Sequence, residues 1–188
     1  MKTGYKYAYV LDVMSNDHPG IVAAVSDEIS SRNGNIDAVS QTVLQGYFSL
    51  IIIVSFPAAI SAEELSAAIE AHNESFQVMA RPYQAEKSVT EAADTFVITA
   101  FGEDCEGIVH KFSHYLAGKD VNIIDLYGDH NGSEFVLIGQ VQVPRRWDIN
   151  HLQADLEEMG RESGYTVKLQ HENIFVATNQ LRFKSQKS

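Results

Sequence analysis

The sequence predicts an α+β fold in two tandem copies. Three observations favour it: an internal repeat, a repeated order of strand-like and helix-like segments, and a chain length that suits two small domains. Residues 10–57 align with residues 97–144 without a gap, at an offset of 87 positions, and 13 of the 48 aligned pairs are identical. Unrelated segments of ordinary composition would share roughly 3. Each repeat is long enough to form a small domain, so we expect two domains within the 188 residues.

The first copy reads as strand, helix, strand, strand, helix, strand. Aromatic and β-branched runs predict strands, and apolar residues three or four apart predict helices. The expected strands are residues 5–14, 35–45, 47–56 and 76–84, and the expected helices are residues 21–32 and 61–73. A turn cluster at residues 15–20 precedes the first helix, and Asn33 with Gly34 ends it. Ser61 and Glu64 match a capping box at the start of the second helix.

The second copy repeats this order. Its expected strands are residues 95–102, 122–129, 133–143 and 165–175, and its expected helices are residues 108–117 and 149–160. Asn131 with Gly132 predicts a hairpin between the two middle strands. The order β-α-β-β-α-β is the ferredoxin-like pattern, in which right-handed crossovers place strands 1 and 3 at the centre of a four-stranded antiparallel sheet with both helices on one face. We expect domains at residues 1–85 and 93–178 and a C-terminal tail at residues 179–188.

One face of the third strand in the first copy is more apolar than a sheet surface open to water would be. Ile51 and Ile53 lie on that face, opposite the face of Phe48 and Leu50. Either something covers part of this face, or strand 35–45 pairs edge to edge with a neighbour. The alternative is that these are a few tolerated apolar side chains on the surface.

Composition excludes several classes of function. The net charge of −11 and the pI of about 5.0 argue against direct binding of nucleic acid, which needs a basic surface. No apolar run approaches the 18 residues of a membrane span, and the first residues have no signal-peptide pattern. The single Cys105 rules out an internal disulfide, so we expect a cytoplasmic protein.

A short motif carries the family resemblance. Asp17-His18-Pro19-Gly20-Ile21-Val22, followed by Asn35-Ile36 in a β-α-β-β-α-β unit, resembles the ACT domain. ACT domains are small-molecule sensor modules, most often for amino acids, attached to biosynthetic enzymes and regulators. A tandem pair of this size is most similar to the glycine cleavage system transcriptional repressor family. The second copy keeps Asp104, Gly107, Ile108, Val109, Asn122 and Ile123 but has Glu106 in place of the proline.

The resemblance implies a ligand site at the start of the first helix of a copy, facing strand 2 of a paired domain. The implied contacts are Asn16, Asp17, His18, Pro19, Gly20, Ile21 and Val22 with Asn35 and Ile36, and the equivalent Asp104, Gly107, Ile108, Asn122 and Ile123. The physics agrees, because a helix N-terminus attracts a carboxylate through its free N–H groups and its dipole. Asp17 or an asparagine carbonyl would accept from the α-amino group of an amino acid.

Each of these residues also has an alternative role. Asp17 and Asp104 would serve equally well as helix caps, and Asn35 and Asn122 as turn formers. Carboxylates crowd the second loop, at Glu103, Asp104 and Glu106. They would repel a ligand carboxylate, so we favour the first loop as the site.

No pattern of catalytic residues is present. Walker, dinucleotide-binding, nucleophile-elbow and zinc-protease motifs are all missing from the sequence. His110 and His114 have a spacing that can bind a metal, but they lie on the solvent side of their helix and no third ligand is evident. We therefore expect no cofactor, no metal and no enzymatic activity, and a plain thiol at Cys105.

The sequence thus predicts a non-enzymatic, cytoplasmic regulatory protein that senses an amino acid and forms a homo-oligomer. By the resemblance, it would act through contact with a protein partner, either a transcription regulator of glycine cleavage or an enzyme. Two alternatives stay open. One is a detached regulatory subunit of an amino-acid or folate-pathway enzyme, and the other is a dimerisation module without a ligand.

Overall fold

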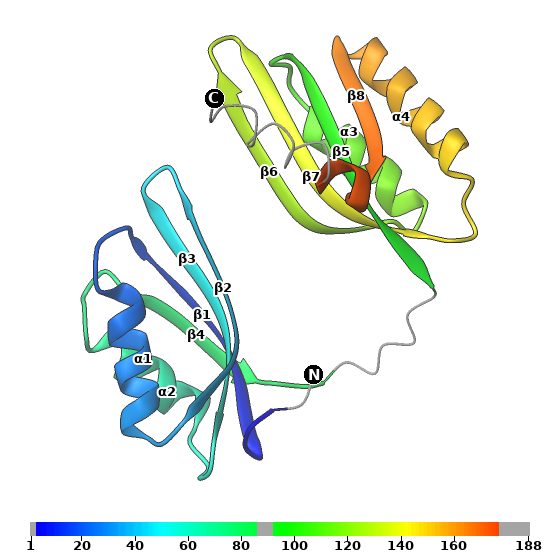
Figure 1. Cartoon of the computed structure of the whole chain (residues 1–188). Coiled ribbons are helices and arrows are strands. Elements are labelled where there is room, and N and C mark those ends of the chain that lie inside the picture. Colours follow the sequence, from blue (N-terminus) through cyan, green and yellow to red (C-terminus); the bar gives the residue numbers. More distant parts are fainter. Residues whose placement is uncertain (1–2, 86–91, 177–188) are drawn as a thin grey trace, which may run out of the picture. The chain divides into compact units, whose positions relative to one another are not determined.

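The computed structural model describes residues 3–85 and 92–176. It divides into two compact units, Met1–Lys87 and Ser88–Ser188, and each has its own sheet and helices (Figure 1). The predicted tail at residues 179–188 and most of the segment between the predicted domains lie outside the described residues. None of the described helices has the length and apolar character needed to cross a membrane.

The first unit has the predicted order of elements. They are β1 (Tyr7–Asn16), α1 (Ile21–Ser31), β2 (Asn35–Leu44), β3 (Tyr47–Phe56), α2 (Ala62–Glu70) and β4 (Gln77–Pro82). The strands form an antiparallel sheet in the order β2-β3-β1-β4, and both helices cover one face (Figure 1). Strands β1 and β3 lie at the centre, as predicted from the handedness of the crossovers.

The second unit repeats the first closely. Its elements are β5 (Ala93–Glu103), α3 (Ile108–Gly118), β6 (Asn122–Asn131), β7 (Glu134–Pro144), α4 (Ile149–Glu162) and β8 (Tyr165–His171), with the sheet order β6-β7-β5-β8. Helices α1 and α3, like strands β2 and β6, begin and end 87 residues apart. Even an irregularity is repeated, because the register shifts between Ile36 and Ala38 in β2 and between Ile123 and Asp125 in β6. The prediction of two βαββαβ units is confirmed.

Each unit has its own hydrophobic core between the sheet and the helices. Alternate residues of β3 point to the helices, so that Leu50 and Val54 are completely buried. The cores differ at several equivalent positions, and two of these differences change side-chain volume in opposite directions. Val25 and Ile52 of the first unit correspond to Phe112 and Gly139 of the second, at the same offset of 87.

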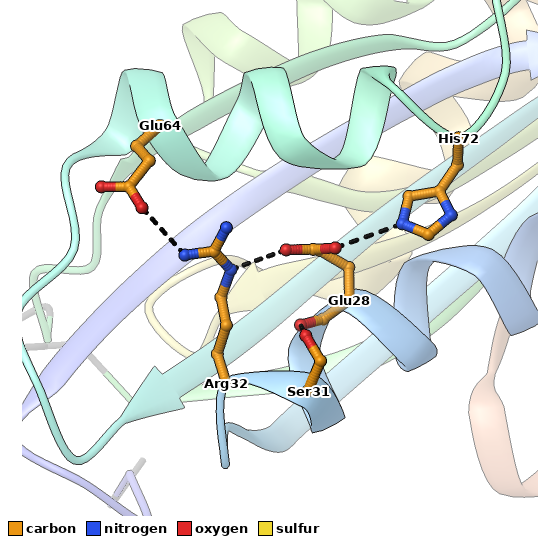
Figure 2. Close-up of polar contacts among 5 residues, drawn as sticks. All are labelled: Glu28, Ser31, Arg32, Glu64 and His72. Carbon is orange, nitrogen blue, oxygen red and sulfur yellow. Dashed lines mark hydrogen bonds and ion pairs between the residues drawn. The ribbon is translucent and has the colours of Figure 1, made fainter.

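A set of charged side chains joins the two helices of the first unit (Figure 2). Glu28 of α1 lies between Arg32 and His72, with an Oε1–Nε distance of 2.6 Å to Arg32 and an Oε2–Nε2 distance of 3.2 Å to His72. Arg32 also donates to Glu64 of α2, with an Nη1–Oε1 distance of 2.9 Å. The hydrogen bond from Arg32 is the main reason why the pKa of Glu28 lies below its usual value, although partial burial opposes the shift.

Several predicted element ends were wrong. Strand β1 runs to Asn16, so Ser15 and Asn16 belong to the strand and not to the turn. Helix α2 ends at Glu70, three residues early. Only one of the two capping-box hydrogen bonds forms, in which Ser61 Oγ accepts from Glu64 N at 3.0 Å. The Glu64 carboxylate accepts from Arg32 instead of from the Ser61 backbone.

The last strand also ends before its predicted limit. Strand β8 stops at His171, and residues 172–176 are helical. They lie against the sheet face opposite α3 and α4 (Figure 1), where Gln140 Nε2 donates to Glu172 Oε1 at 2.7 Å. The His171 ring also packs edge-on against Phe96, with 5.2 Å between the ring centroids. The Phe96–His171 contact is a cross-strand pair of β5 and β8, whereas the hydrogen bond from Gln140 joins the helical segment after β8 to the sheet.

Candidate functional site

Helices α1 and α3 begin in an unusual way. Gly20 and Gly107 occupy their N-cap positions in the left-handed conformation, with φ of 100° and 83°, and no side chain among the described residues caps either helix. By contrast, Ser61 caps α2 and Asp148 caps α4. The alternative that Asp17 and Asp104 are helix caps is therefore wrong, because a glycine lies at each cap position instead.

The missing cap leaves backbone donors at the start of α1. The first intrahelical bond runs from Ala24 N to Gly20 O at 2.9 Å, so the N–H groups of residues 21–23 have no partner within the helix. Because these groups and the helix dipole both favour negative charge, an anion is the natural ligand at this position. The side chains of Ile21 and Ile108 lie in the cores, so a ligand would meet only their backbone.

The loop before α1 is held in place by the turn between β2 and β3. Asp17 N donates to Gly46 O at 2.8 Å, and the equivalent bond in the second unit runs from Asp104 N to Ser133 O at 3.2 Å. The backbone N–H of Asp17 is thus occupied, while its carboxylate is exposed. A ligand at this loop could reach the carboxylate but not that N–H group.

His18 fixes the other side of the loop. Its ring stacks on Phe76, with 6.1 Å between the centroids and 10° between the planes. Its Nδ1 lies 3.0 Å from the oxygen of Pro19, and its Nε2 lies 3.5 Å from Asn73 Nδ2. His18 is half-buried, so these contacts favour a structural role in joining the loop to the segment between α2 and β4.

A chain of hydrogen bonds continues from Asn73 toward β1. Asn73 Oδ1 accepts from both the backbone N and the Oγ of Ser75, each at 2.9 Å. The hydroxyl groups of Ser75 and Ser15 are 2.7 Å apart. This network orders the wall of an open hollow beside the loop, which is lined by Met14, Ser15, Asn16, Tyr47, Glu74, Ser75 and Gln77.

Of the predicted site residues, Asn16 lines this hollow, and Asp17 to Gly20 form the loop next to it. Sequence reasoning missed Met14 and Ser15, which precede Asn16 on β1, and four further neighbours of the site, Tyr47, Glu74, Ser75 and Gln77. Ser15 left a signal, because a polar residue at a helix-facing strand position that is 7 % exposed needs a partner. The other four come from distant segments, and no local pattern connects them to the loop.

Asn35 and Ile36 are not brought to this loop by their own unit. Asn35 pairs with Ser55 on β3 whereas Asn16 pairs with Tyr47, eight positions away along the same strand. That separation corresponds to roughly 26 Å. The Asn35 amide is also used locally, because its Nδ2 donates to Asp37 Oδ1 at 2.7 Å. Asn122 and Ile123 occupy the equivalent positions at the start of β6.

The corresponding loop of the second unit has different chemistry. Glu103, Asp104 and Glu106 are all exposed around the start of α3, and Cys105 is half-buried in the position of His18. Tyr165 takes the position of Phe76, and burial raises the pKa of its hydroxyl group. That hydroxyl has no hydrogen-bond partner in the described part of the chain. Helix α3 therefore begins in a strongly acidic setting, which disfavours a bound carboxylate.

The histidine pair on α3 lies on the solvent side, as predicted. His110 and His114 are exposed, and their rings stack with 5.7 Å between the centroids. Within residues 3–85 and 92–176, no group of three or more histidine, cysteine, aspartate or glutamate side chains is placed to hold a metal ion.

Comparison with known families gives one match that covers most of the chain. The ACT domain matches residues 9–81 and again residues 94–170. A UPF0237 protein of Methanococcus maripaludis is 35% identical over 83 residues, which are 44% of this chain and 92% of that protein. A UPF0237 protein of Corynebacterium diphtheriae is 45% identical over 47 residues, and this match spans 25% of this chain and 53% of that relative, about half its length.

Two solved structures are similar over both units. A crystal structure of an unknown protein from Galdieria sulphuraria has a TM-score of 0.76 at 24% identity and covers 88% of this chain and 98% of that chain. A crystal structure of a candidate glycine cleavage system transcriptional repressor has a TM-score of 0.63 at 16% identity and covers 87% of this chain and 95% of that chain. At these identities the likeness establishes the shared fold.

Proposed function

The chain belongs to the ACT-domain family and carries two tandem ACT domains, and from this premise we propose that it is a non-enzymatic regulatory protein that senses an amino acid. The ligand binds at the loop of residues 16–20 and the start of α1. The sensor then acts on a protein partner by direct contact. This partner is a transcription regulator or an enzyme, and the protein works in the cytoplasm.

The uncapped start of α1 carries this proposal. A ligand carboxylate accepts hydrogen bonds from the free N–H groups at the start of the helix, where the dipole also favours negative charge. The α-amino group needs an acceptor, and the exposed carboxylate of Asp17 lies in the same loop. Asn16 and Glu74, which line the adjoining hollow, add a carbonyl and a second carboxylate on that side.

The proposed contacts from strand 2 come from another domain. Since Asn35 and Ile36 lie at the opposite end of the sheet from their own loop, a paired ACT domain supplies them, or their equivalents Asn122 and Ile123. This pairing follows from the family resemblance, and it accounts for a homo-oligomer as the working form. The Asn35 carbonyl remains available as an acceptor because its local bond uses the Nδ2 group.

The two loops do not contribute equally. Around α1, Asp17 is the acidic residue of the loop, whereas three exposed carboxylates surround the start of α3. A carboxylate ligand therefore prefers the first unit. The net charge of −11 also supports a protein that reaches nucleic acid only through a partner.

Binding is tested first by a thermal-shift screen of the amino acids, beginning with glycine because of the structural likeness to a candidate glycine cleavage repressor. A ligand at 100 times its Kd adds about 2.7 kcal/mol to the free energy of unfolding. A screen in which no amino acid raises the melting temperature would contradict the proposal.

Calorimetric titration of Asp17→Ala then tests the site. The variant should bind the ligand about 1–3 kcal/mol more weakly, because the ligand ammonium loses its acceptor. Its melting temperature without ligand should be close to that of the wild type, since Asp17 does not cap α1. Asp104→Ala, at the matching position of the second unit, is the control and should leave the affinity unchanged. Equal affinity of Asp17→Ala and wild type would defeat this role of Asp17.

A further inference from the structure

The sheet of the second unit has a face turned away from its helices, and the middle of this face is apolar. Strand register places Tyr127 of β6 beside Ile138 of β7 in one row, and Val136 of β7 beside Phe101 of β5 in the next. Tyr127 and Phe101 are 52% and 45% exposed, and the two residues of β7 are half-buried. Within the described residues, large apolar side chains therefore stay open to solvent here.

The same face is acidic, and we name it the acidic face. Four carboxylates lie at its register positions: Glu103, Asp125, Asp129 and Glu134. Among the described positions of this face, Lys168 of β8 is the one basic residue. None of the four carboxylates has an ion-pair partner in the part of the chain that the structure describes. The face therefore combines apolar surface with uncompensated negative charge.

The first unit has no such charge at the equivalent positions. The residues 87 positions earlier are uncharged, namely Asn16, Ala38, Thr42 and Tyr47. The apolar centre is present there too, since Ile51 takes the place of Ile138 and is 51% exposed. The four carboxylates are therefore a property of the second unit and not a requirement of the fold.

The chain that follows β8 already reaches the acidic face. Residues 172–176 are helical and lie against it (Figure 1), and Gln140 Nε2 donates to Glu172 Oε1 at 2.7 Å. Val97, in the row of Gln140, is only 5% exposed, whereas the equivalent Val10 of the first unit is half-buried. This row is the neighbour of the row of Ile138, so the chain leaves β8 directly onto the acidic face.

The sequence that comes next complements this face. Residues 177–188, which lie outside the described part of the chain and which we name the basic segment, hold three basic residues and no acidic one. The preceding 176 residues hold 11 basic and 25 acidic residues. Within the basic segment, Leu181 and Phe183 alternate with Arg182 and Lys184. Apolar and cationic side chains thus follow one another where the face offers apolar rows and carboxylates.

The basic segment is long enough to cross the sheet. Its 12 residues span roughly 18 Å as a helix and roughly 40 Å when extended. The four strands of the sheet, about 4.8 Å apart, span roughly 14 Å.

We propose that the basic segment binds to the acidic face of its own unit. Leu181 and Phe183 cover the apolar rows, and burial of this surface supplies most of the attraction. The cations lie beside the carboxylates, which favours this face over the uncharged positions of the first unit. As a tethered ligand the segment has an effective concentration on the order of 1 mM, so it keeps free segments of similar composition off the face.

Trypsin digestion of the full chain, followed by mass spectrometry, tests whether the basic segment is bound. The wild type should be cut after Arg182 and Lys184 at least about tenfold more slowly than a free peptide of residues 177–188, because cleavage follows the fraction of unbound segment. About 0.5 M salt should bring the two rates closer together, since it screens the charges.

Variants of the face locate the contact. Asp125→Asn with Asp129→Asn should speed the cuts at least about threefold, because two opposite charges are lost together. Phe101→Ser should speed them as well, through lost apolar contact.

Each variant has a matched control in the first unit. Asp27→Asn with Glu63→Gln changes the net charge by the same amount on exposed helix positions and should leave the rate unchanged. Met14→Ser, at the position equivalent to Phe101, should also have no effect. Circular dichroism verifies that all variants are folded.

A spin label gives a second measurement that needs no change to the face. Attached to Ser185→Cys in a Cys105→Ser background of the full chain, it should broaden the amide resonances of β6 and β7 and leave those of β2 and β3 sharp. Broadening of the first unit alone, or of neither unit, would overturn the proposal. So would a wild-type segment cut as fast as the free peptide, or cuts that respond equally to the face variants and their controls.

Discussion

Gly20 and Gly107 each stand at the point where a loop becomes a helix. Their positive φ angles lie in the region that side chains disfavour by about 1–2 kcal/mol, although a Cβ atom at either position would meet nothing within 4 Å. The requirement is therefore conformational and not one of space. It also keeps larger capping residues away from the helix start, which is why the backbone donors there stay free.

Replacement of Gly107 by alanine should destabilise the second unit by about 1 kcal/mol, because alanine is strained at this φ angle. Gly118→Ala, at the other end of α3, is the matched control, since that glycine has a normal φ angle and open space around it. It should be neutral or slightly stabilising. Trp147 is the only tryptophan and lies in the second unit, so its fluorescence during denaturant unfolding measures both variants. Equal stability of the two variants would contradict the conformational argument.

At the scale of residues, the sequence predicted the site in part. The motif from Asp17 to Val22 located the loop and the helix start, because glycine and proline mark such a boundary whatever surrounds it. It did not reveal that Gly20 itself is the cap, since an aspartate three residues earlier fits the usual preference equally well. The hollow beside Asn16 could not be predicted, because its walls come from three separate segments of the chain.

At the scale of elements, the contact between α1 and α2 depends on a carboxylate that stays ionised. Glu28 has 15% of its side chain exposed and accepts from both Arg32 and His72. Its pKa is lowered in the folded state, chiefly by the hydrogen bond from Arg32. A lowered pKa contributes stability above the unfolded value of roughly 4.3, and that contribution is lost as the pH falls through the folded pKa.

Glu28→Gln should therefore reduce the stability of the first unit by about 1 kcal/mol at neutral pH, a modest value because the ion pairs are partly exposed. The difference from wild type should shrink as the pH falls below about 4 and both forms become neutral. Asp27→Asn is the control, because Asp27 is exposed on the same helix and has no ion pair within the described residues. Thermal melts across this pH range measure the effect. A deficit that stays constant at acid pH would mean that packing, and not charge, is responsible.

The order of the elements was predictable, and so were their starting points to within two residues, while several of their ends were wrong by up to four residues. Starts carry local signals, such as Ser61 before α2 and Gly132 between β6 and β7. Ends depend on tertiary contacts. Residues 172–176 leave the strand to lie against the sheet with Glu172 bonded to Gln140, and nothing local to that segment indicates the change.

At the scale of the whole molecule, the two units have separate cores. Leu50 and Leu137 occupy equivalent positions in them, 0% and 5% exposed. Leu50→Ala should lower the stability of the first unit by about 3 kcal/mol and leave the Trp147 transition unchanged, whereas Leu137→Ala should shift that transition. Circular dichroism, which follows both units, should show the first effect. If Leu50→Ala moves the Trp147 midpoint, the units unfold as one.

The difference between the two cores affects whether β3 and β7 can exchange between the two sheets while the chain folds. Two neighbouring units with the same topology invite strand exchange during synthesis, a known failure of tandem domains. Here β7 in the first sheet would leave an empty space where Ile52 belongs. In the reverse exchange, Ile52 would crowd Leu126, since a Cβ atom at Gly139 would already lie 3.3 Å from Leu126 Cδ1. The paired changes of Val25 and Ile52 to Phe112 and Gly139 thus give the two sheets different shapes, which disfavours an exchange of β3 and β7 between them.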